Sequence, residues 1–398
     1  MRICFLSPQI PSGAYGRRGW SFLSALAAQG HEITLCCIAD PGPVEDAARR
    51  IEGLGIPIHA VSISRLKRWG YCLTGWFGKT PLRILHCRSG ALREVFLSEL
   101  RDGRYDLLHV DRFRMAPYAM AAREFFCGPV VVDYPDALSL YYQRAVKNPR
   151  HFFKAFIDRR ENRVIPLYEQ VLLNHDFIHL VCSEVDRAVL RSLNPQAHIE
   201  VITHRVDTAE FQPRSRKDLA ARGVFTGTLY YLPNIDGLLW LREKVLPLIS
   251  DRKMMIDVVG FGATSELDPV KADPRFHMTG YVERMSDHLF QEDIYLCPIH
   301  IAAGVRNKLL EAFAAGMATV STRMGYEGID CEPGTHLLVA ESPDEFADAI
   351  RFLLDHPDER RRIGNAARQL VCERYSPEAF ECSIQSFYAR VLNKSGDF

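Results

Sequence analysis

The chain has 398 residues, about the length of two ordinary domains, with 47% hydrophobic and 25% charged side chains. Basic and acidic residues number 49 each, so no net charge attracts nucleic acid, and any basic surface must be local. The 11 cysteines lack the spacing of a zinc or redox site, and no run is long and apolar enough to span a membrane. The N-terminal run is too short for a secretion signal. We therefore expect a cytoplasmic protein that binds neither nucleic acid nor a metal.

In the first half, short apolar runs alternate with segments of helical period. Each run is short enough for a buried strand, and the helical pattern after the first one ends at Gly30. Strands are predicted at residues 2–7, 32–39, 106–110, 129–134 and 178–183. This alternation predicts a doubly wound α/β domain with a parallel sheet, in which the loops after the strands meet at one edge.

The loop after the first strand carries glycines and two arginines near the start of a helix: Gly13, Gly16, Arg17 and Arg18. A helix N-terminus with adjacent cations favours an anionic ligand, which here is either a donor phosphate or an anionic acceptor. The alternative is a solvated helix cap without a ligand.

Residues 64–84 interleave aromatic and basic side chains. The aromatic residues are Trp69, Tyr71, Trp76 and Phe77, and the basic ones are Arg65, Lys67, Arg68, Lys79 and Arg83. This mixture suits a lipid headgroup boundary and predicts peripheral contact with the inner face of the plasma membrane. The alternative is a helix or loop that packs its aromatic side chains inward and leaves the cations in water.

A second α/β series follows the polar segment 206–222, which has the composition of an interdomain linker. Strands are predicted at residues 223–229, 254–262, 276–282, 293–299, 318–322 and 336–340. The predicted organisation is an N-terminal domain over 1–205, a C-terminal domain over 223–375 and a final helix over 376–398 that packs back toward the N-terminal domain. Two such domains enclose a cleft, and ligands of these folds bind at the carboxyl ends of the strands.

The stretch "AAGVRNKLLEAFAAG", residues 302–316, predicts a loop followed by a helix. The N–H groups and dipole at the helix start attract phosphate, Gly304 permits close approach of the backbone, and Arg306 and Lys308 add cations suited to a diphosphate. Glu311 has the wrong charge for that anion but can accept hydrogen bonds from two vicinal hydroxyls, such as those of a ribose. The pattern therefore indicates a nucleoside diphosphate. The alternative is an exposed ion pair between Lys308 and Glu311.

Several ordered segments of the second half resemble the nucleotide-binding domain of the GT-B glycosyltransferases, specifically glycosyltransferase family 4. They are "VFTGTLYYLPNIDGLLWL", "DVVGFG", "MTGYV", "LCPIHIAAGVRNKLLEAFAAG", "HLLVAESPDEFADAI" and "ERYSPEAF", joined in the first half by "SEVDRAVL" and "VDTAEFQP". The resemblance implies a GT-B fold, in which two Rossmann-like domains face a central cleft. It also implies that the C-terminal domain holds a nucleoside diphosphate-sugar donor, that the N-terminal domain holds the acceptor, and that no cofactor is used.

The resemblance implies a role for each matching residue on the donor side. Glu311 matches the ribose-binding glutamate, and Tyr281 and Val282 match a loop whose backbone contacts the base. Two positions depart from the family pattern: Thr228 stands where an arginine is frequent, and Ala303 stands where a glutamate usually reaches the sugar. The donor set implied by the resemblance comprises Gly227, Thr228, Tyr281, Val282, Gly304, Val305, Arg306, Lys308 and Glu311.

A subgroup associated with bacterial exopolysaccharide and cell-surface glycan assembly is more similar, because it also lacks that glutamate and has an aspartate-rich segment like "VDYPDALS". Under this resemblance Asp111, Asp133 and Asp136 are catalytic candidates at strand ends of the acceptor domain. A carboxylate there can orient an acceptor hydroxyl or accept its proton. The alternative is ordinary turn chemistry after a strand. Where many family members have a catalytic histidine, this chain has Asp111, two residues after His109.

We therefore expect a retaining, metal-independent hexosyltransferase that acts on a glycan or polyprenyl-linked acceptor. Retention is carried over from the family. Metal independence is inferred from the absence of an Asp-x-Asp run and from the cations available to the leaving diphosphate. The alternative is a GT-B-like protein that binds a nucleotide-sugar or a partner enzyme without catalysis. Ala303 favours this alternative, whereas the complete set of Arg306, Lys308 and Glu311 disfavours it.

Overall fold

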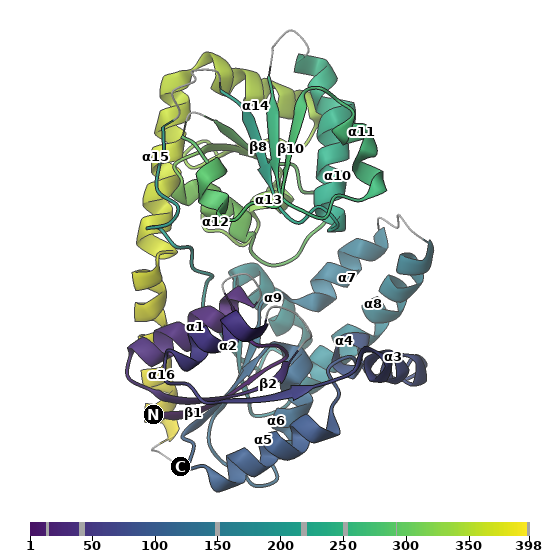
Figure 1. Ribbon diagram of the computed structural model, residues 1–398, viewed down its shortest axis with the longest axis vertical. Coiled ribbons are helices and arrows are strands. Elements are labelled where there is room, and N and C mark those ends of the chain that lie inside the picture. The colour runs from purple at the N-terminus through teal and green to yellow at the C-terminus, as the bar shows by residue number, and fades with distance from the viewer. Residues whose placement is uncertain are drawn as a thin grey trace. The chain divides into compact units, whose positions relative to one another are not determined.

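The chain folds as two α/β units, shown in Figure 1. Unit 1 comprises residues 1–203 and 381–398, and unit 2 comprises residues 204–380. The computed structural model describes residues 1–12, 16–39, 44–147, 152–215, 221–249, 254–291 and 293–395.

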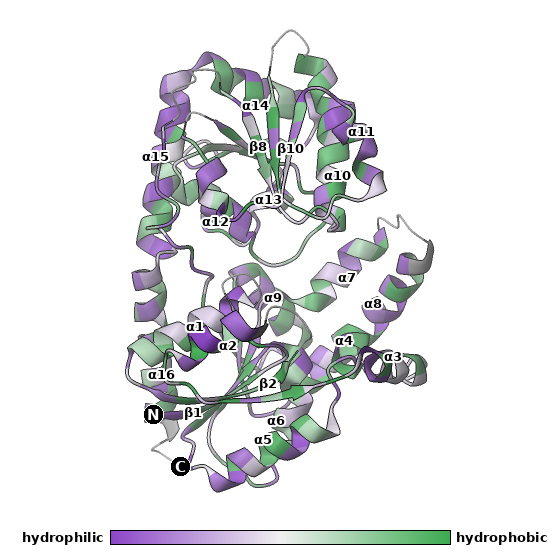
Figure 2. Ribbon diagram, viewed as in Figure 1, coloured by the Kyte–Doolittle hydropathy of each residue, from purple (hydrophilic) through white to green (hydrophobic). Residues whose placement is uncertain are grey.

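Unit 1 is built on a parallel sheet of seven strands in the order β3-β2-β1-β4-β5-β6-β7. All residues of β4 and β5 are buried, and the strands of this sheet are mostly green, that is hydrophobic, in Figure 2. Helices cover both faces of such a sheet, which is why its strands are continuous apolar runs. The strands are β1 (Arg2–Ser7), β2 (Glu32–Ala39), β3 (Ile58–Ser62), β4 (Leu107–Asp111), β5 (Val130–Tyr134), β6 (Ile178–Val181) and β7 (His198–Val201).

The helices of unit 1 lie on both sides of the sheet. Figure 1 shows α1 and α2 on one side and α5 and α6 on the other. Ser64, Ser89 and Ser183 each cap a helix by accepting a hydrogen bond from a backbone N–H in the first turn. The helices are α1 (Arg17–Ala28), α2 (Val44–Glu52), α3 (Arg65–Thr74), α4 (Leu82–Leu85), α5 (Gly90–Asp102), η1 (Phe113–Met115), α6 (Ala116–Ala122), α7 (Leu138–Lys147), α8 (Phe152–Leu173) and α9 (Glu184–Leu193).

The last helix, α16 (Pro377–Ser395), starts in unit 2 and belongs to unit 1 from Glu381 onward. Ser376 caps this helix, because its hydroxyl accepts the N–H of Ala379 at 3.2 Å. Within unit 1, the Tyr388 hydroxyl lies 2.6 Å from Nδ1 of the buried His109 on β4. This buried contact fixes the C-terminal half of α16 to the first sheet.

Unit 2 contains a parallel sheet of six strands in the order β10-β9-β8-β11-β12-β13. α14 packs on η2, η3 and β12, and α15 packs on α12 and β12. The elements are β8 (Gly223–Thr226), α10 (Leu232–Trp240), η2 (Leu241–Val245), η3 (Leu246–Ile249), β9 (Ile256–Val259), η4 (Ser265–Leu267), α11 (Asp268–Lys271), β10 (Phe276–Gly280), η5 (Met285–His288), β11 (Ile294–Cys297), α12 (Asn307–Ala314), β12 (Ala318–Ser321), α13 (Arg323–Tyr326), β13 (Leu338–Val339), α14 (Pro343–Asp355) and α15 (Pro357–Arg374).

Every strand predicted from the sequence exists, but β3 and β7 were missed. Both are edge strands with one paired neighbour, and most of their residues are exposed or half-buried, so their hydrophobic signal is weak. Part of the predicted linker packs on unit 2, where Phe211 is buried and its carbonyl accepts a hydrogen bond from Arg368. None of the helices that the structure describes combines the length and apolar character needed to cross a lipid bilayer.

Candidate functional site

The loop between β11 and α12 presents the start of a helix. Gly304 has φ +72°, a left-handed conformation that glycine adopts without strain. α12 begins at Asn307, and within the described residues no side chain caps its N-terminus. At the other end Gly316 has φ +71°, the left-handed conformation in which a glycine commonly ends a helix. The helix start therefore leaves backbone N–H donors available to a ligand.

The amine of Lys308 lies in the first turn of α12 and faces neutral groups. Its Nζ donates to Oδ1 of Asn234 at 2.8 Å and lies 4.1 Å from the centre of the Phe225 ring. No carboxylate pairs with it in the part of the chain that the structure describes. Burial lowers the pKa of Lys308 to about 8, and the charge of Arg306 acts in the same direction. A desolvated cation without a carboxylate partner has the chemistry to bind an anionic ligand, and the contact of Lys308 with a diphosphate remains a prediction.

Asn234 joins Lys308 to the loop after β8. Its Nδ2 donates to the carbonyl oxygen of Thr228 at 2.9 Å, and a Cβ at Gly227 would collide with the same amide group. The three predicted donor residues Gly227, Thr228 and Lys308 therefore converge on one asparagine that was not among the predicted residues.

Glu311 lies one turn further along α12 and is buried, with 5% of its surface exposed. An exposed ion pair between Lys308 and Glu311 is therefore ruled out, because Lys308 binds Asn234 instead. A carboxylate oxygen can accept hydrogen bonds from hydroxyls of a ligand, and contact of Glu311 with a ribose remains a prediction.

The guanidinium of Arg306 donates to the carbonyl oxygens of Gly304 and Met324. Arg306 is only 8% exposed, so its hydrogen bonds stabilise the loop at Gly304 from the interior of the unit. Val305 beside it is also buried. Contact of Arg306 with a diphosphate remains a prediction.

An exposed aromatic row lies at the loop predicted to contact the base. Tyr281, which precedes the half-buried Val282, makes an edge-to-face contact with Phe261 at 6.1 Å between ring centres, and Phe261 makes another with Tyr230 at the same distance. All three rings are exposed. Such a row offers flat apolar surface for stacking a planar ring. Tyr230 and Phe261 were not predicted as site residues.

In unit 1, two of the three candidate aspartates are buried at the carboxyl ends of β4 and β5. Both carboxylate oxygens of Asp133 accept hydrogen bonds from Nε of Arg18, at 2.8 and 2.9 Å. Asp111 accepts the Ser7 hydroxyl at 2.8 Å. Burial raises the pKa of Asp133, and Arg18 opposes this. Asp136 is half-buried and therefore the most accessible of the three.

The predicted first loop is described only in part. Gly13 lies outside the described residues. Gly16 has φ +69° immediately before α1, Arg17 is exposed, and Arg18 is buried against Asp133. Contact of these arginines with an anionic ligand remains a prediction, and for Arg18 it would have to form beside the bond to Asp133.

Arg112 is a further residue at this edge. It follows Asp111 and has φ +72°, the one non-glycine residue with a positive φ in the described ranges. Its Nε is buried and has no hydrogen-bond partner among the described atoms. Such strain is concentrated at functional sites because the surrounding structure must enforce it.

Models of glycosyltransferase domains match both units. A model described as "Glycosyl transferase 4-like domain" matches residues 13–204, and one described as "Glycosyl transferases group 1" matches residues 220–356. The chain is a glycosyltransferase of the GT-B fold.

Solved structures share this fold at low sequence identity. Sucrose-phosphate synthase from Thermosynechococcus elongatus has a TM-score of 0.72 and 14% identity, over 99% of the glycosyltransferase and 100% of that chain. HepE from Anabaena, in complex with UDP-glucose, has a TM-score of 0.65 and 14% identity, over 98% and 100%. An "Uncharacterized 44.6 kDa protein in cps region" of Klebsiella pneumoniae is 26% identical over 171 residues. That match covers 40% of the glycosyltransferase and 44% of the Klebsiella protein.

Residues 64–84 of the glycosyltransferase carry large apolar side chains on the surface. Leu66 is 85% exposed, Trp69 66%, Leu73 70% and Phe77 97%. Inward packing, the alternative interpretation of this segment, is therefore wrong for these residues. Trp76 and Tyr71 are half-buried: Trp76 stacks on Phe156, and the ring of Tyr71 contacts the guanidinium of Arg88.

The sequence signals for the missed residues of the glycosyltransferase were present but weak. Phe225 and Asn234 lie in the segment that carried the family resemblance, but neither has a motif of its own. Arg112 directly follows the candidate Asp111, yet nothing in the sequence reveals a positive φ. Only the fold brings these side chains to the strand ends.

Proposed function

We propose that the glycosyltransferase transfers a sugar, with retention of configuration, from a nucleoside diphosphate-sugar to a glycan or polyprenyl-linked acceptor in the assembly of bacterial cell-surface polysaccharide. The observation that carries the donor assignment is the desolvated amine of Lys308, without a carboxylate partner, at the uncapped start of α12. The UDP-glucose in the HepE complex and the cps region of the Klebsiella relative support the donor class and the biological process.

On the donor side, the diphosphate binds the N–H groups of α12 and the ammonium of Lys308. Glu311 accepts hydrogen bonds from the ribose hydroxyls, and the base stacks on the row formed by Tyr230, Phe261 and Tyr281. Ala303 offers no polar side chain to the sugar, so selection of the sugar falls to backbone groups of this loop and to unit 1.

In the reaction, the acceptor oxygen bonds to the anomeric carbon while the bond from that carbon to the diphosphate oxygen breaks. The leaving diphosphate gains negative charge, which Lys308 and the start of α12 stabilise. The acceptor proton passes to a carboxylate of unit 1. Asp136 is the strongest candidate for this role because it is more accessible than Asp111 and Asp133. Asp133 acts by holding Arg18 in place.

We also propose that residues 64–84 bind an anionic membrane surface. The exposed Leu66, Trp69, Leu73 and Phe77 supply the apolar contact. No acidic residue occurs between Glu52 and Glu94, whereas this stretch contains Arg65, Lys67, Arg68, Lys79, Arg83, Arg88 and Arg93. Each cation near an anionic surface contributes about 1 kcal/mol.

Sedimentation with lipid vesicles tests the membrane contact. The protein should bind phosphatidylglycerol vesicles more strongly than phosphatidylcholine vesicles, and added salt should weaken the binding. Leu73→Glu should abolish it, whereas Leu54→Glu, at an exposed apolar position of unit 1 outside the segment, should leave it intact. Equal sedimentation of both variants would refute the contact.

Incubation of the purified protein with a panel of nucleotide-sugars and a prenyl-linked acceptor tests the transferase activity. We expect release of a nucleoside diphosphate with one donor, and an unchanged anomeric configuration in the product by NMR. The Lys308→Gln variant should no longer release nucleoside diphosphate. Thermal stabilisation by a nucleotide without any turnover would instead support the non-catalytic alternative.

A further inference from the structure

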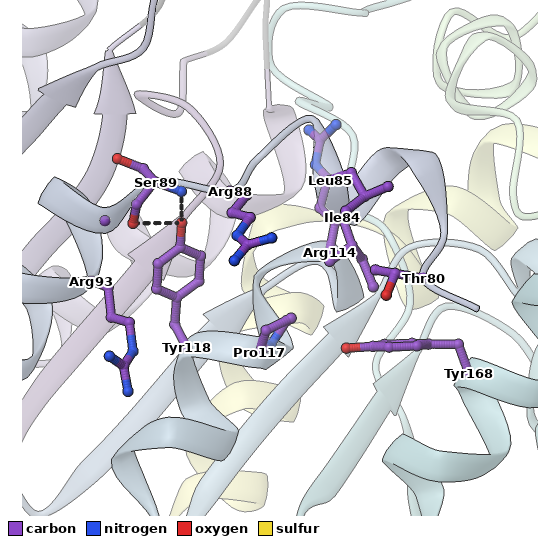
Figure 3. Close-up of a pocket in the computed structure, with 11 residues that line it drawn as sticks. Thr80, Ile84, Leu85, Arg88, Ser89, Arg93, Arg114, Pro117, Tyr118 and Tyr168 are labelled. Atoms are coloured by element: carbon purple, nitrogen blue, oxygen red, sulfur yellow. Dashed lines mark hydrogen bonds between the residues drawn. The ribbon is translucent and has the colours of Figure 1, made fainter. Parts of the chain in front are cut away.

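Unit 1 contains a pocket of about 490 Å³, a volume typical of small-molecule sites. It is lined by α4, the start of α5, the turn after β4, α6 and α8. α5 is the helix that leads into β4 and runs back along the sheet, and the turn containing Arg114 follows β4, so both begin at the carboxyl edge of the sheet, where Asp111 and Asp133 lie. Figure 3 shows the side chains around this pocket, with Arg88 between Tyr118 and Tyr168.

Positive charge dominates the pocket. Among the residues that the structure describes, three arginines line it, Arg88, Arg93 and Arg114, and no acidic residue does. None of the three forms an ion pair with a carboxylate in the ranges that the structure describes. Nε of Arg114 is buried without a hydrogen-bond partner among these residues, and burial lowers the pKa of Arg114. Leaving a buried guanidinium N–H unpaired is costly, and an anion would satisfy it.

The start of α5 adds to the positive electrostatic potential of the pocket. Ser89 and Gly90 line the pocket at the first turn of this 13-residue helix, whose first turn contains no acidic residue. The positive end of the helix dipole therefore reinforces the arginines. Arginine forks match the oxygen geometry of phosphate, and several cations around one site suit a group with more than one negative charge.

The remaining lining is aromatic and apolar, and it adjoins α3. Tyr118, Tyr168 and Pro117 line the pocket, and in Figure 3 the Tyr168 hydroxyl points toward Pro117. The guanidinium of Arg88 lies 5.5 Å from the centre of the Tyr71 ring on α3. The pocket is thus continuous with the segment that carries the exposed apolar side chains, and it has more room than a phosphate group fills.

We propose that this pocket binds the phosphate or diphosphate group of the acceptor, and that the group attached to the phosphate lies against Tyr118 and Tyr168. The proposal rests on the proposed transferase function, because it gives the acceptor a phosphate group. The arginines fix the phosphate at the carboxyl edge of the first sheet. A prenyl chain attached to it would continue toward the apolar side chains of α3.

Calorimetric titration of the full-length protein with farnesyl diphosphate and with inorganic diphosphate tests the proposal. We expect Arg88→Gln with Arg93→Gln to weaken binding of farnesyl diphosphate about 100-fold, because each charge-assisted hydrogen bond contributes about tenfold. Arg104→Gln, which removes an exposed cation of unit 1 outside the pocket, should have no effect. Lys308→Gln, which weakens the proposed diphosphate site of unit 2, should retain the pocket binding, and the two probes are compared in this variant so that only the pocket is measured.

The two probes distinguish the source of the phosphate. Tighter binding of farnesyl diphosphate supports a lipid-linked acceptor, and equal binding of both supports recognition of the phosphate alone. Unchanged affinity in the double variant overturns the proposal. If the double variant unfolds, Arg88→Lys with Arg93→Lys keeps the charges and removes the forks, and its affinity must still fall.

The outcomes for the pocket and for the transferase are separable. Normal release of nucleoside diphosphate by a wild-type protein that binds neither probe would refute the pocket and leave the transferase intact. The opposite outcome is a protein that binds farnesyl diphosphate through Arg88 and Arg93 but releases no nucleoside diphosphate. This result would support the anion site and refute the proposed transferase function.

Discussion

Lys308 should make nucleotide binding depend on pH in the alkaline range. Its pKa is lowered to about 8 by burial, so a large fraction of the amine is already neutral near that pH. A bound diphosphate favours the ammonium form, so the affinity should change little around pH 7 and should fall by up to about tenfold per pH unit above pH 8.

Substitution of Lys308 measures how much free energy its contact with the diphosphate contributes to binding. A hydrogen bond to a charged group contributes about 1.5–3 kcal/mol, so Lys308→Gln should weaken binding roughly 10- to 150-fold at pH 7. The remaining affinity should no longer change between pH 7 and 9. Calorimetric titration with UDP measures both effects.

Lys271→Gln is the matched control for this experiment. Lys271 is an exposed cation of unit 2 that binds Asp268, so its removal changes the net charge equally but leaves α12 untouched. Its affinity and pH profile should match those of the wild type. A flat wild-type profile, or full affinity in Lys308→Gln, would refute the assignment of Lys308 to the diphosphate.

Four further substitutions test buried groups. Glu311→Gln should weaken UDP binding about tenfold in the same titration, and unchanged affinity would remove the ribose assignment. Burial raises the pKa of Glu169 from 4.5 to about 7, so the native state holds this proton more tightly than the unfolded chain does. The free energy of unfolding of the wild type should therefore fall by up to roughly 3 kcal/mol as the pH rises from about 4.5 to about 7. Glu169→Gln should not show this fall when urea unfolding is measured at both pH values. Tyr388→Phe leaves Nδ1 of His109 unpaired and should lower the free energy of unfolding by about 1–3 kcal/mol, and an unchanged urea midpoint would contradict this. Arg18→Met leaves the Asp133 carboxylate buried without its cation and should cost about 3–5 kcal/mol in the same assay, with a smaller loss if Asp133→Asn is added.

Much of the fold could be predicted from the sequence because burial leaves a local pattern. Strands such as β4 and β5 are covered on both faces and are therefore continuous apolar runs. The helix start at residue 307 and its stop at Gly316 are also local signals. The edge strands β3 and β7 escaped prediction because half-exposed residues produce no such run.

The partners of the site residues could not be predicted in this way. Asn234 and Lys308 are 74 residues apart, and Arg18 and Asp133 are 115 residues apart. Their contacts depend on the strand order, which places β8 beside β11 and places β4 between β1 and β5. Hydrophobic periodicity carries no information about that order, so the sequence alone left the acceptor-side aspartates as a list of candidates.

By itself, the sequence determined the α/β class, nearly all strands, the glycine-containing loop before α12 and the basic, aromatic character of residues 64–84. Only the tertiary structure decided that Lys308 faces Asn234 instead of Glu311, that Asp133 binds Arg18, and that Trp69 and Phe77 lie on the surface. The reason is physical: secondary structure follows from side-chain periodicity within a few turns, whereas burial and charge pairing follow from which segments pack together.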